Sequence, residues 1–242
     1  MKKMELSTIY KLLTSPFRWY AHLFKGRPWY VKLLSALASF VVFVILYLGA
    51  VDIDLFGLFG KSPSMETVRN TRPAQASEIY SADGVLMGKF FNENRTPVKY
   101  EEVNPVFWEA LIDTEDERFY HHYGVDIPAL FAVAKDYVIH HDARGASTIT
   151  QQLAKNLFRV RTEYSTGLLG RVPGLKIVVM KSKEWVTALK LEWNFTKEEI
   201  LTMYANTVDF GSNAYGIKTA CKTYFGIAPK DLRAEQAAVL VG

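Results

Sequence analysis

Apolar and polar positions divide the chain into an unbroken apolar run, a mixed connecting segment and a helical remainder. Leu33 to Val51 is 19 residues long and carries no charge, which matches the roughly 20 residues needed to cross a bilayer core. Residues 56–73 are rich in Gly, Pro and Ser, and from Asn104 onward apolar residues recur at helical spacing. The pattern predicts one membrane helix followed by a mainly α domain.

Five segments follow from this pattern. We predict a basic tail at 1–32, a transmembrane helix at 33–51, a linker at 52–76, a short β-containing segment at 77–103 and a helical domain at 104–242. The one strand signal is Asp83-Gly84 between two short runs, which is typical of a β-hairpin. The chain ends at Gly242 inside an apolar helical run, so we expect the domain to be truncated at its C-terminus.

Helix starts are marked by capping residues. Asn104 is a ready N-cap with Pro105 at the first helical position. Thr148-x-x-Gln151 and Thr196-x-x-Glu199 both have the spacing of capping boxes.

Charge adds an orientation to the membrane helix. Residues 1–32 carry seven Lys or Arg against Glu5 alone, whereas Asp52 and Asp54 follow the apolar run directly. The positive-inside rule therefore places the tail in the cytoplasm and the rest of the chain outside. A cleaved signal peptide is the alternative, but the run is long for such a segment and no small-x-small site follows it.

The remaining charge argues against a nucleic-acid protein. The net charge is +4 and the tail alone carries +6, so the other residues sum to −2. The single cysteine, Cys221, allows no internal disulfide and is interpreted as a small packed hydrophobe. Residues 143–183 nonetheless form a basic belt that suits a phosphate-bearing ligand or anionic lipids: Arg144, Lys155, Arg159, Arg161, Arg171, Lys176, Lys181 and Lys183.

Two carboxylates fall on apolar helix stripes. Glu115 follows Trp108 and Leu111 at helical spacing, and Glu184 lies on a second stripe, with Lys181 one turn before it. A structural ion pair could explain either one, and a surface salt bridge between Lys181 and Glu184 would stabilise little. Two such carboxylates together suit glycosidic chemistry, which uses a pair.

Two other features of the polar segments bear on chemistry. The adjacent His121 and His122 would point in different directions, which disfavours a metal site, so we predict none. In GASTITQQLAKNLF, Ser147 or Thr148 caps a helix whose first N–H groups could bind phosphate. The side chains of Gln151, Gln152, Lys155 and Asn156 would add donors.

These residues carry a resemblance to a known family. Glu115-Asp116-x-x-Phe119-x-x-His122-x-Gly124-x-Asp126 resembles the first signature of the peptidoglycan glycosyltransferases, glycosyltransferase family 51. Gly145-x-Ser147-Thr148-Ile149-Thr150-Gln151-Gln152-x-x-Lys155-Asn156 resembles the second and Lys181-x-x-Glu184 the third. Asn206, Gly211 and Tyr215-Gly216-Ile217 are similar to the fourth, and Glu235-Gln236-Ala237-Ala238 to the last. The segment before residue 104 resembles that of bifunctional class A penicillin-binding proteins.

The resemblance implies a lysozyme-like helical domain that polymerises lipid II into β-1,4-linked glycan strands with release of undecaprenyl diphosphate. It implies Glu115 as the base that takes the acceptor proton and Asp116 as its support or a sugar contact. Glu184 would orient Lys181 and stabilise the leaving diphosphate, with Mg²⁺ or Mn²⁺ as an optional cation and no organic cofactor. The diphosphate would be held by Ser147, Gln152, Lys155, Asn156 and Lys181, together with an arginine left open among Arg159, Arg161 and Arg171.

The same resemblance implies partners and a location. The partners are lipid II, the growing glycan strand, the membrane and other cell-wall synthesis proteins, with no nucleic acid. The implied location is the bacterial cytoplasmic (inner) membrane, with the N-terminus in the cytoplasm and the catalytic domain outside. Two alternatives stay open: a membrane-anchored glycan hydrolase on the same fold, and an inactive scaffold in a cell-wall complex.

Overall fold

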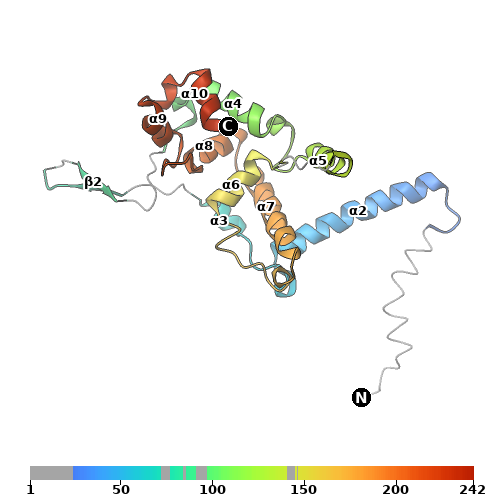
Figure 1. The fold of residues 1–242 in the computed structure, drawn as a ribbon. Helices are drawn as coiled ribbons and strands as arrows, with labels where there is room; N and C mark the ends of the chain where they lie inside the picture. Colours follow the sequence, from blue (N-terminus) through green and yellow to red (C-terminus); the bar gives the residue numbers. More distant parts are fainter. Residues whose placement is uncertain (1–23, 72–76, 84–85, 91–96, 141–144, 146) are drawn as a thin grey trace, which may run out of the picture. The chain divides into compact units, whose positions relative to one another are not determined.

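The computed structural model describes residues 24–71, 77–83, 86–90, 97–140, 145 and 147–242. The chain divides into two compact units, Met1–Gly49 and Ala50–Gly242. The described part of the first unit consists mainly of helix α2, Trp29–Asp52, whose last residues belong to the second unit (Figure 1). Among the described residues α2 is the one helix long and apolar enough to cross a membrane. It contains the predicted span 33–51.

The second unit is mainly helical, as the sequence predicts. The 3-10 helix η1 (Leu55–Gly57) and the short helix α3 (Met65–Arg69) come first. The strands β1 (Ser77–Tyr80) and β2 (Leu86–Phe90) follow and pair antiparallel. The predicted hairpin is therefore present, although Gly84 lies outside the described residues. The remaining elements are η2 (Tyr100–Glu102), α4 (Pro105–Glu115), η3 (Phe119–His121), α5 (Ile127–His140), α6 (Ile149–Leu157), η4 (Leu169–Arg171), α7 (Leu175–Asn194), α8 (Lys197–Thr207), α9 (Ile217–Phe225), η5 (Pro229–Asp231) and α10 (Ala234–Val241).

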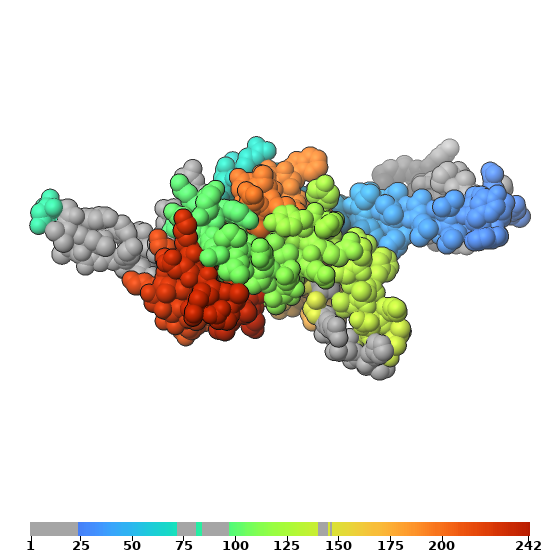
Figure 2. Space-filling model, turned by 90° about the horizontal axis from the view of Figure 1, so that it is seen from above, coloured from blue at the N-terminus to red at the C-terminus, as the bar shows by residue number. Residues whose placement is uncertain are grey.

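Helix α6 lies at the centre of this unit. It packs against α7 and α8, while α10 packs against α4 (Figures 1 and 2). The shared core buries aromatic and branched side chains from all of these helices, and removing such apolar surface from water is the main stabilising contribution. Its fully buried members include Phe107, Phe119, Ile149, Leu153, Leu191, Ile200 and Ile217.

The predicted caps are mostly confirmed. The side chain of Asn104 accepts from Val106 N at the start of α4, and Thr196 and Glu199 form a reciprocal capping box at the start of α8. Thr148 caps α6 by accepting from Gln151 N, but the capping box predicted there is wrong in its second half. The buried Gln151 amide donates instead to the Gly124 carbonyl at 3.1 Å, because that tertiary acceptor is otherwise shielded from water.

Candidate active site

Glu115 ends α4 and is half-buried beneath two polar side chains. Gln152 Nε2, from α6, donates to Glu115 Oε2 at 2.5 Å, and Tyr204 Oη, from α8, donates to Gln152 Oε1 at 3.2 Å. Burial, and then the negative charge of Glu115, raise the pKa of Tyr204 well above its usual value. Tyr204 therefore remains a hydrogen-bond donor, and it fixes which end of the Gln152 amide faces the carboxylate.

Glu184 is a buried carboxylate held by two cations. It is 1% exposed, and its two oxygens contact Lys181 Nζ at 2.8 Å and Arg161 Nε at 2.5 Å. Lys181 Nζ also donates to Ser147 Oγ at 2.8 Å. The predicted Lys181–Glu184 pair is therefore present, but it is not a surface salt bridge, since removing one partner would leave a buried charge.

The start of α6 connects these two clusters. Lys181 and Arg161, which both contact Glu184, are called the cation cluster below. Ser147 precedes the Thr148 cap and contacts Lys181 of this cluster, whereas Gln152 lies one turn into the helix and contacts Glu115. The Thr148 hydroxyl donates to the Gly124 carbonyl at 2.7 Å, which fixes this helix start against the loop that follows Glu115. The start of α6 thus holds the Glu115 carboxylate on one side and the Lys181 ammonium on the other.

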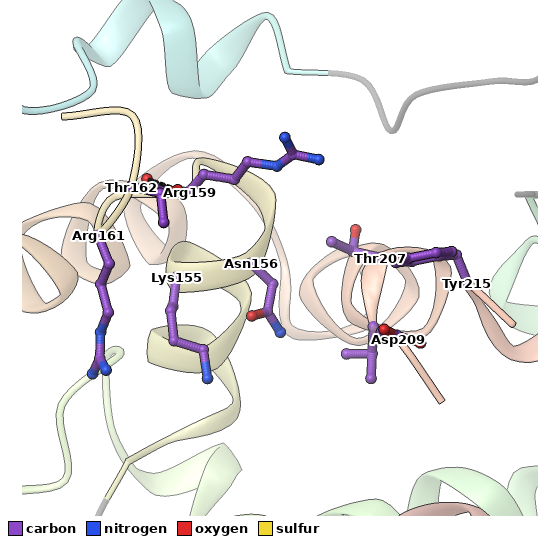
Figure 3. Close-up of a pocket in the computed structure, with 9 residues that line it drawn as sticks. Lys155, Asn156, Arg159, Arg161, Thr162, Thr207, Asp209 and Tyr215 are labelled. Atoms are coloured by element: carbon purple, nitrogen blue, oxygen red, sulfur yellow. Dashed lines mark hydrogen bonds between the residues drawn. The ribbon is translucent and has the colours of Figure 1, made fainter. Parts of the chain in front are cut away.

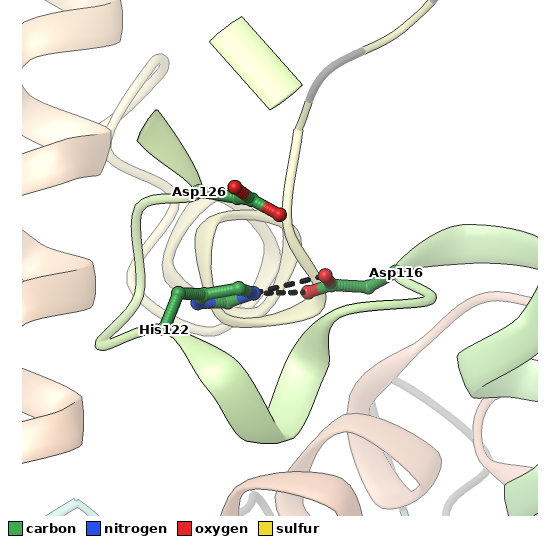
Figure 4. Close-up of side chains that lie close together, drawn as sticks. All are labelled: Asp116, His122 and Asp126. Atoms are coloured by element: carbon green, nitrogen blue, oxygen red, sulfur yellow. Dashed lines mark hydrogen bonds and ion pairs between the residues drawn. The ribbon is translucent and has the colours of Figure 1, made fainter. Parts of the chain in front are cut away.

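Asp116, His122 and Asp126 form a buried cluster whose ligand atoms all lie within 4.8 Å of one another (Figure 4). His122 Nδ1 accepts from Gly124 N at 3.1 Å, so Nε2 carries the proton and donates to Asp116 at 2.9 Å. Asp116 also accepts from Ile149 N at 3.0 Å, and Asp126 pairs with Arg118 at 3.1 Å. The cluster therefore ties the Glu115 loop to the start of α6, and its atoms suit a metal only after losing these partners.

A pocket of about 630 Å³ lies beside the cation cluster (Figure 3). Lys155 and Asn156 of α6 line it together with Arg161, and α8 contributes Thr207. The Thr207 hydroxyl is buried and has no hydrogen-bond partner among the described residues. The other lining residues are Arg159, Thr162, Val208, Asp209 and Tyr215. Three cations against one carboxylate make this pocket suitable for an anion.

A second pocket, of about 450 Å³, lies on the Glu115 side. It includes Ser147, Thr148 and the single cation Arg118, and its acidic lining residues are Asp113, Glu115, Asp116, Glu117, Asp126 and Asp136. The site therefore has an acidic half and a basic half. This separation of charge suits a reaction in which one group gives up a proton while another leaves as an anion.

The structure brings the sequence-predicted residues together in two groups. Glu115 and Gln152 form one, and Ser147, Lys181 and Glu184 form the other. Lys155 and Asn156 line the basic pocket, whereas Asp116 lies at the acidic pocket with both of its oxygens already bonded, to His122 and to Ile149 N. Of the two roles left open for Asp116, the geometry favours support.

Sequence reasoning missed several residues of the site. Among the three candidate arginines, Arg161 contacts Glu184, a choice that sequence spacing could not make across a loop. Tyr204, Thr207 and Asp209 reach the site because α8 packs on α6. The spacing of these residues in YANTVD is a weak signal of a functional site, because the same helical spacing also occurs where side chains simply pack in the core.

A half-buried carboxylate thus lies beside a paired cation cluster on a helical domain, an arrangement that suits glycosyl transfer. The chain belongs to the transglycosylase family, whose model matches residues 83–242. It is 34% identical to penicillin-binding protein 1A of Escherichia coli over 194 residues and 36% identical to penicillin-binding protein 1A of Pseudomonas aeruginosa over 181 residues. Penicillin-binding protein 1A of Aquifex aeolicus is 33% identical over 200 residues.

These relatives are much longer than the matched region. The alignments cover 78%, 74% and 82% of this chain but 21%, 20% and 26% of the three relatives, respectively. The matched region spans the whole candidate site, from Glu115 to Tyr215.

Proposed function

We propose that this chain is a peptidoglycan glycosyltransferase that polymerises lipid II into β-1,4-linked strands and releases undecaprenyl diphosphate. The observation that carries the proposal is the start of α6, where Gln152 holds Glu115 and Ser147 holds Lys181. Family membership supports the reaction class. The division into an acidic and a basic half supports the assignment of acceptor and donor ends.

Glu115 acts as the general base. Its carboxylate takes the proton from the acceptor sugar 4-hydroxyl as that oxygen attacks the donor anomeric carbon, with inversion. Gln152 fixes the carboxylate by a hydrogen bond to one oxygen, and the other oxygen faces the acceptor. Asp116 and His122 act one step further away, by holding the loop that follows Glu115.

The cation cluster holds the donor diphosphate. Lys155 and Arg161 line the same pocket, and Lys181 stands beside it on Ser147. As the bond to the anomeric carbon breaks, negative charge grows on the diphosphate, and fixed cations stabilise that charge without rearranging. Glu184 does not touch the diphosphate in this mechanism; it keeps Lys181 and Arg161 in place.

A divalent cation does not fit at Glu184 or at the Asp116, His122 and Asp126 cluster without disrupting the contacts of those side chains. Both oxygens of Glu184 are engaged by cations, and the Asp116, His122 and Asp126 atoms are engaged by hydrogen bonds or Arg118. The proposed steps therefore use the side-chain cations alone. Rates measured with Mg²⁺, with Mn²⁺ and with a chelator should agree within about twofold.

The membrane helix completes the proposal. A polyprenyl substrate stays in the bilayer, so an enzyme anchored by α2 meets it at a raised effective concentration. We propose that the N-terminus is cytoplasmic and that the site lies outside the cytoplasmic membrane. The exposed apolar residues Ile127 and Phe131 of α5 and Ile177 of α7 are suited to contact the lipid interface.

The test is polymerisation of labelled lipid II by the detergent-solubilised chain. Glu115→Gln should lose at least about 100-fold of the rate, because a carboxamide cannot accept the proton. Glu109→Gln, an exposed change on the same helix, is the matched control and should retain the rate. Cleavage of preformed glycan without polymer formation would point to a hydrolase. Full activity of Glu115→Gln would contradict the proposed base.

A further inference from the structure

Lys183 is a buried lysine next to Glu184 on α7, and the mechanism above gives it no role. Its side chain has no exposed surface. Its Nζ donates to the Lys61 carbonyl at 2.7 Å and to the Ser165 carbonyl at 2.5 Å. Burial lowers the pKa of Lys183 to about 8, against an opposing effect from the charge of Asp54. An ammonium is costly to bury, and the two carbonyl acceptors offset part of that cost while joining Lys183 to two separate segments.

The two carbonyls belong to two segments that run together. Lys61 lies in the connection after α2, residues 53–63, and Ser165 lies in the loop from Arg159 to Pro173. The segments are also joined by backbone hydrogen bonds from Leu168 N to Gly57 O at 3.0 Å and from Leu169 N to Leu58 O at 2.9 Å. A Cβ at Gly60 would overlap the Ser165 carbonyl, so the approach depends on glycine there.

The connection is itself firmly attached to α7. The Asp54 carboxylate accepts from Phe59 N at 3.1 Å and from Gly60 N at 2.6 Å, which closes a tight turn. Two helical turns beyond Lys183, Lys190 Nζ donates to the Pro63 carbonyl at 2.7 Å and pairs with Asp52, the last residue of α2. Lysines seven residues apart share one face of α7, so this face holds both ends of the connection.

The loop held by Lys183 is also the loop that carries Arg161. Arg161 lies four residues before Ser165, in a turn closed by bonds from Thr162 N and Glu163 N to the Arg159 carbonyl. The loop is therefore fixed to α7 at two successive residues: Arg161 contacts Glu184, and Ser165 contacts Lys183. A loop released at Ser165 would give Arg161 more freedom to leave Glu184.

We propose that Lys183 is a positioning residue that clamps the connection after the membrane helix to the Arg161 loop and so fixes Arg161 beside the donor pocket. This inference rests on the proposed function only for its kinetic consequence, because the clamp itself can be measured without substrate. Lys183 touches no substrate, and its effect passes through Arg161.

The first experiment measures the clamp directly. Limited trypsin digestion of the detergent-solubilised chain, mapped by mass spectrometry, reports exposure of the bonds after Arg159, Arg161 and Arg171. Trypsin should cleave the Lys183→Met variant at these bonds at least about tenfold faster than the unmodified chain, since local opening of the loop becomes easier. The Lys222→Met variant, an exposed change on α9, should be cleaved at the same rate as the unmodified chain. Equal cleavage in Lys183→Met and the unmodified chain would overturn the clamp.

The second experiment measures its kinetic consequence in a double-mutant cycle. Lys183→Met should lower kcat/KM by about the same factor as Arg161→Ala, and the double variant should be no slower than Arg161→Ala alone. The thermal midpoint, in contrast, should fall by the same amount in both backgrounds. A merely structural lysine would lower kcat/KM equally in both backgrounds, and that result would overturn the positioning role.

The two proposals fail in different ways. If the unmodified chain forms no polymer, the proposed function fails, and the trypsin result still decides whether Lys183 clamps the loop. If polymer forms and the effects of the two substitutions on kcat/KM multiply in the double variant, the proposed function stands and the positioning role of Lys183 is contradicted.

Discussion

Gln152 joins Glu115 to Tyr204: its amide nitrogen donates to the carboxylate at 2.5 Å, and its amide oxygen accepts the tyrosine hydroxyl at 3.2 Å. Tyr204 thereby prevents the amide from turning over and presenting its oxygen to the carboxylate. The orientation of the proposed base is set by a residue that does not contact it through a hydrogen bond.

Tyr204→Phe should therefore slow polymerisation although Phe fills the same space. We expect kcat to fall about three- to tenfold, since the lost hydrogen bond is worth about 1 kcal/mol. Steady-state kinetics with lipid II measure it, and Tyr123→Phe, at a tyrosine 79% exposed, is the control. An unchanged kcat in Tyr204→Phe would show that Gln152 is oriented by other contacts.

Gln152→Leu should have a larger effect, because it removes the donor to a charged group. Hydrogen bonds to charged groups contribute about 1.5–3 kcal/mol, so we expect kcat to fall about 10- to 100-fold. Gln152→Glu should be at least as slow, because two carboxylates would then face each other. A faster Glu variant than Leu variant would contradict this assignment.

Thr207 offers a test of the donor pocket that separates binding from stability. Its buried hydroxyl is unpartnered among the described residues, so Thr207→Val should leave the free energy of unfolding unchanged or raise it by up to about 1 kcal/mol. If a sugar or phosphate oxygen bonds this hydroxyl, KM for lipid II should rise about three- to tenfold.

The matched control is Thr187→Val on α7, where a hydroxyl that is also buried and unpartnered within the described residues does not line the donor pocket. Urea unfolding should show the same direction of change for both variants, whereas only Thr207→Val should alter KM. Identical KM values in both variants would remove Thr207 from the pocket's binding groups.

Lys183 predicts a difference in how stability depends on pH. Its pKa is about 8 in the folded chain against an ordinary lysine value of 10.5, so between these two pH values the unfolded chain binds more protons. The free energy of unfolding of the unmodified chain should therefore rise relative to that of Lys183→Met, by about 2 kcal/mol between pH 7.5 and pH 10. Urea unfolding at pH 7.5 and pH 10 gives the comparison, and a difference that stays constant would contradict it.

Local signals in the sequence predicted the elements well. Asn104 with Pro105 and Thr196 with Glu199 form caps from residues within one turn, so no distant contact was needed to place them. Gln151 shows where local reasoning ended: its side chain was expected to cap its own helix, but the Gly124 carbonyl, far along the chain, is its acceptor.

The site was predicted as a set of residues but not as an arrangement. Glu115 and Glu184 stood out because charges on apolar stripes are unusual, and both are at least half-buried. The choice of Arg161 over its neighbours, and the burial of Lys183 and Lys190, depend on how the connection after α2 folds back onto α7. Helical periodicity contains no information on such contacts between distant segments.

Asn206 fixes the backbone where the chain enters the helical domain. Its side chain accepts from Val98 N at 2.8 Å and donates to Val98 O at 2.9 Å, both buried. Asn206→Leu should lower the free energy of unfolding by about 2–4 kcal/mol, because two backbone groups lose their partners. Asn206→Asp should lower it by at least as much, because a buried carboxylate oxygen would then face the Val98 carbonyl oxygen. Chemical denaturation measures both, and an unchanged free energy of unfolding in Asn206→Leu would contradict the two-bond account.

The two Asn206 hydrogen bonds also fix the position of Val98 independently of the chain that precedes it. Thr71, which precedes β1, and Pro97, which follows β2, line the same pocket and so lie close together. Because the Asn206 side chain holds the Val98 backbone directly, we expect changes in the length of the chain between Thr71 and Pro97 to leave α4 and Glu115 in place. The length of chain between Thr71 and Pro97 is therefore expected to be set by what that segment binds and not by the packing of the helical domain.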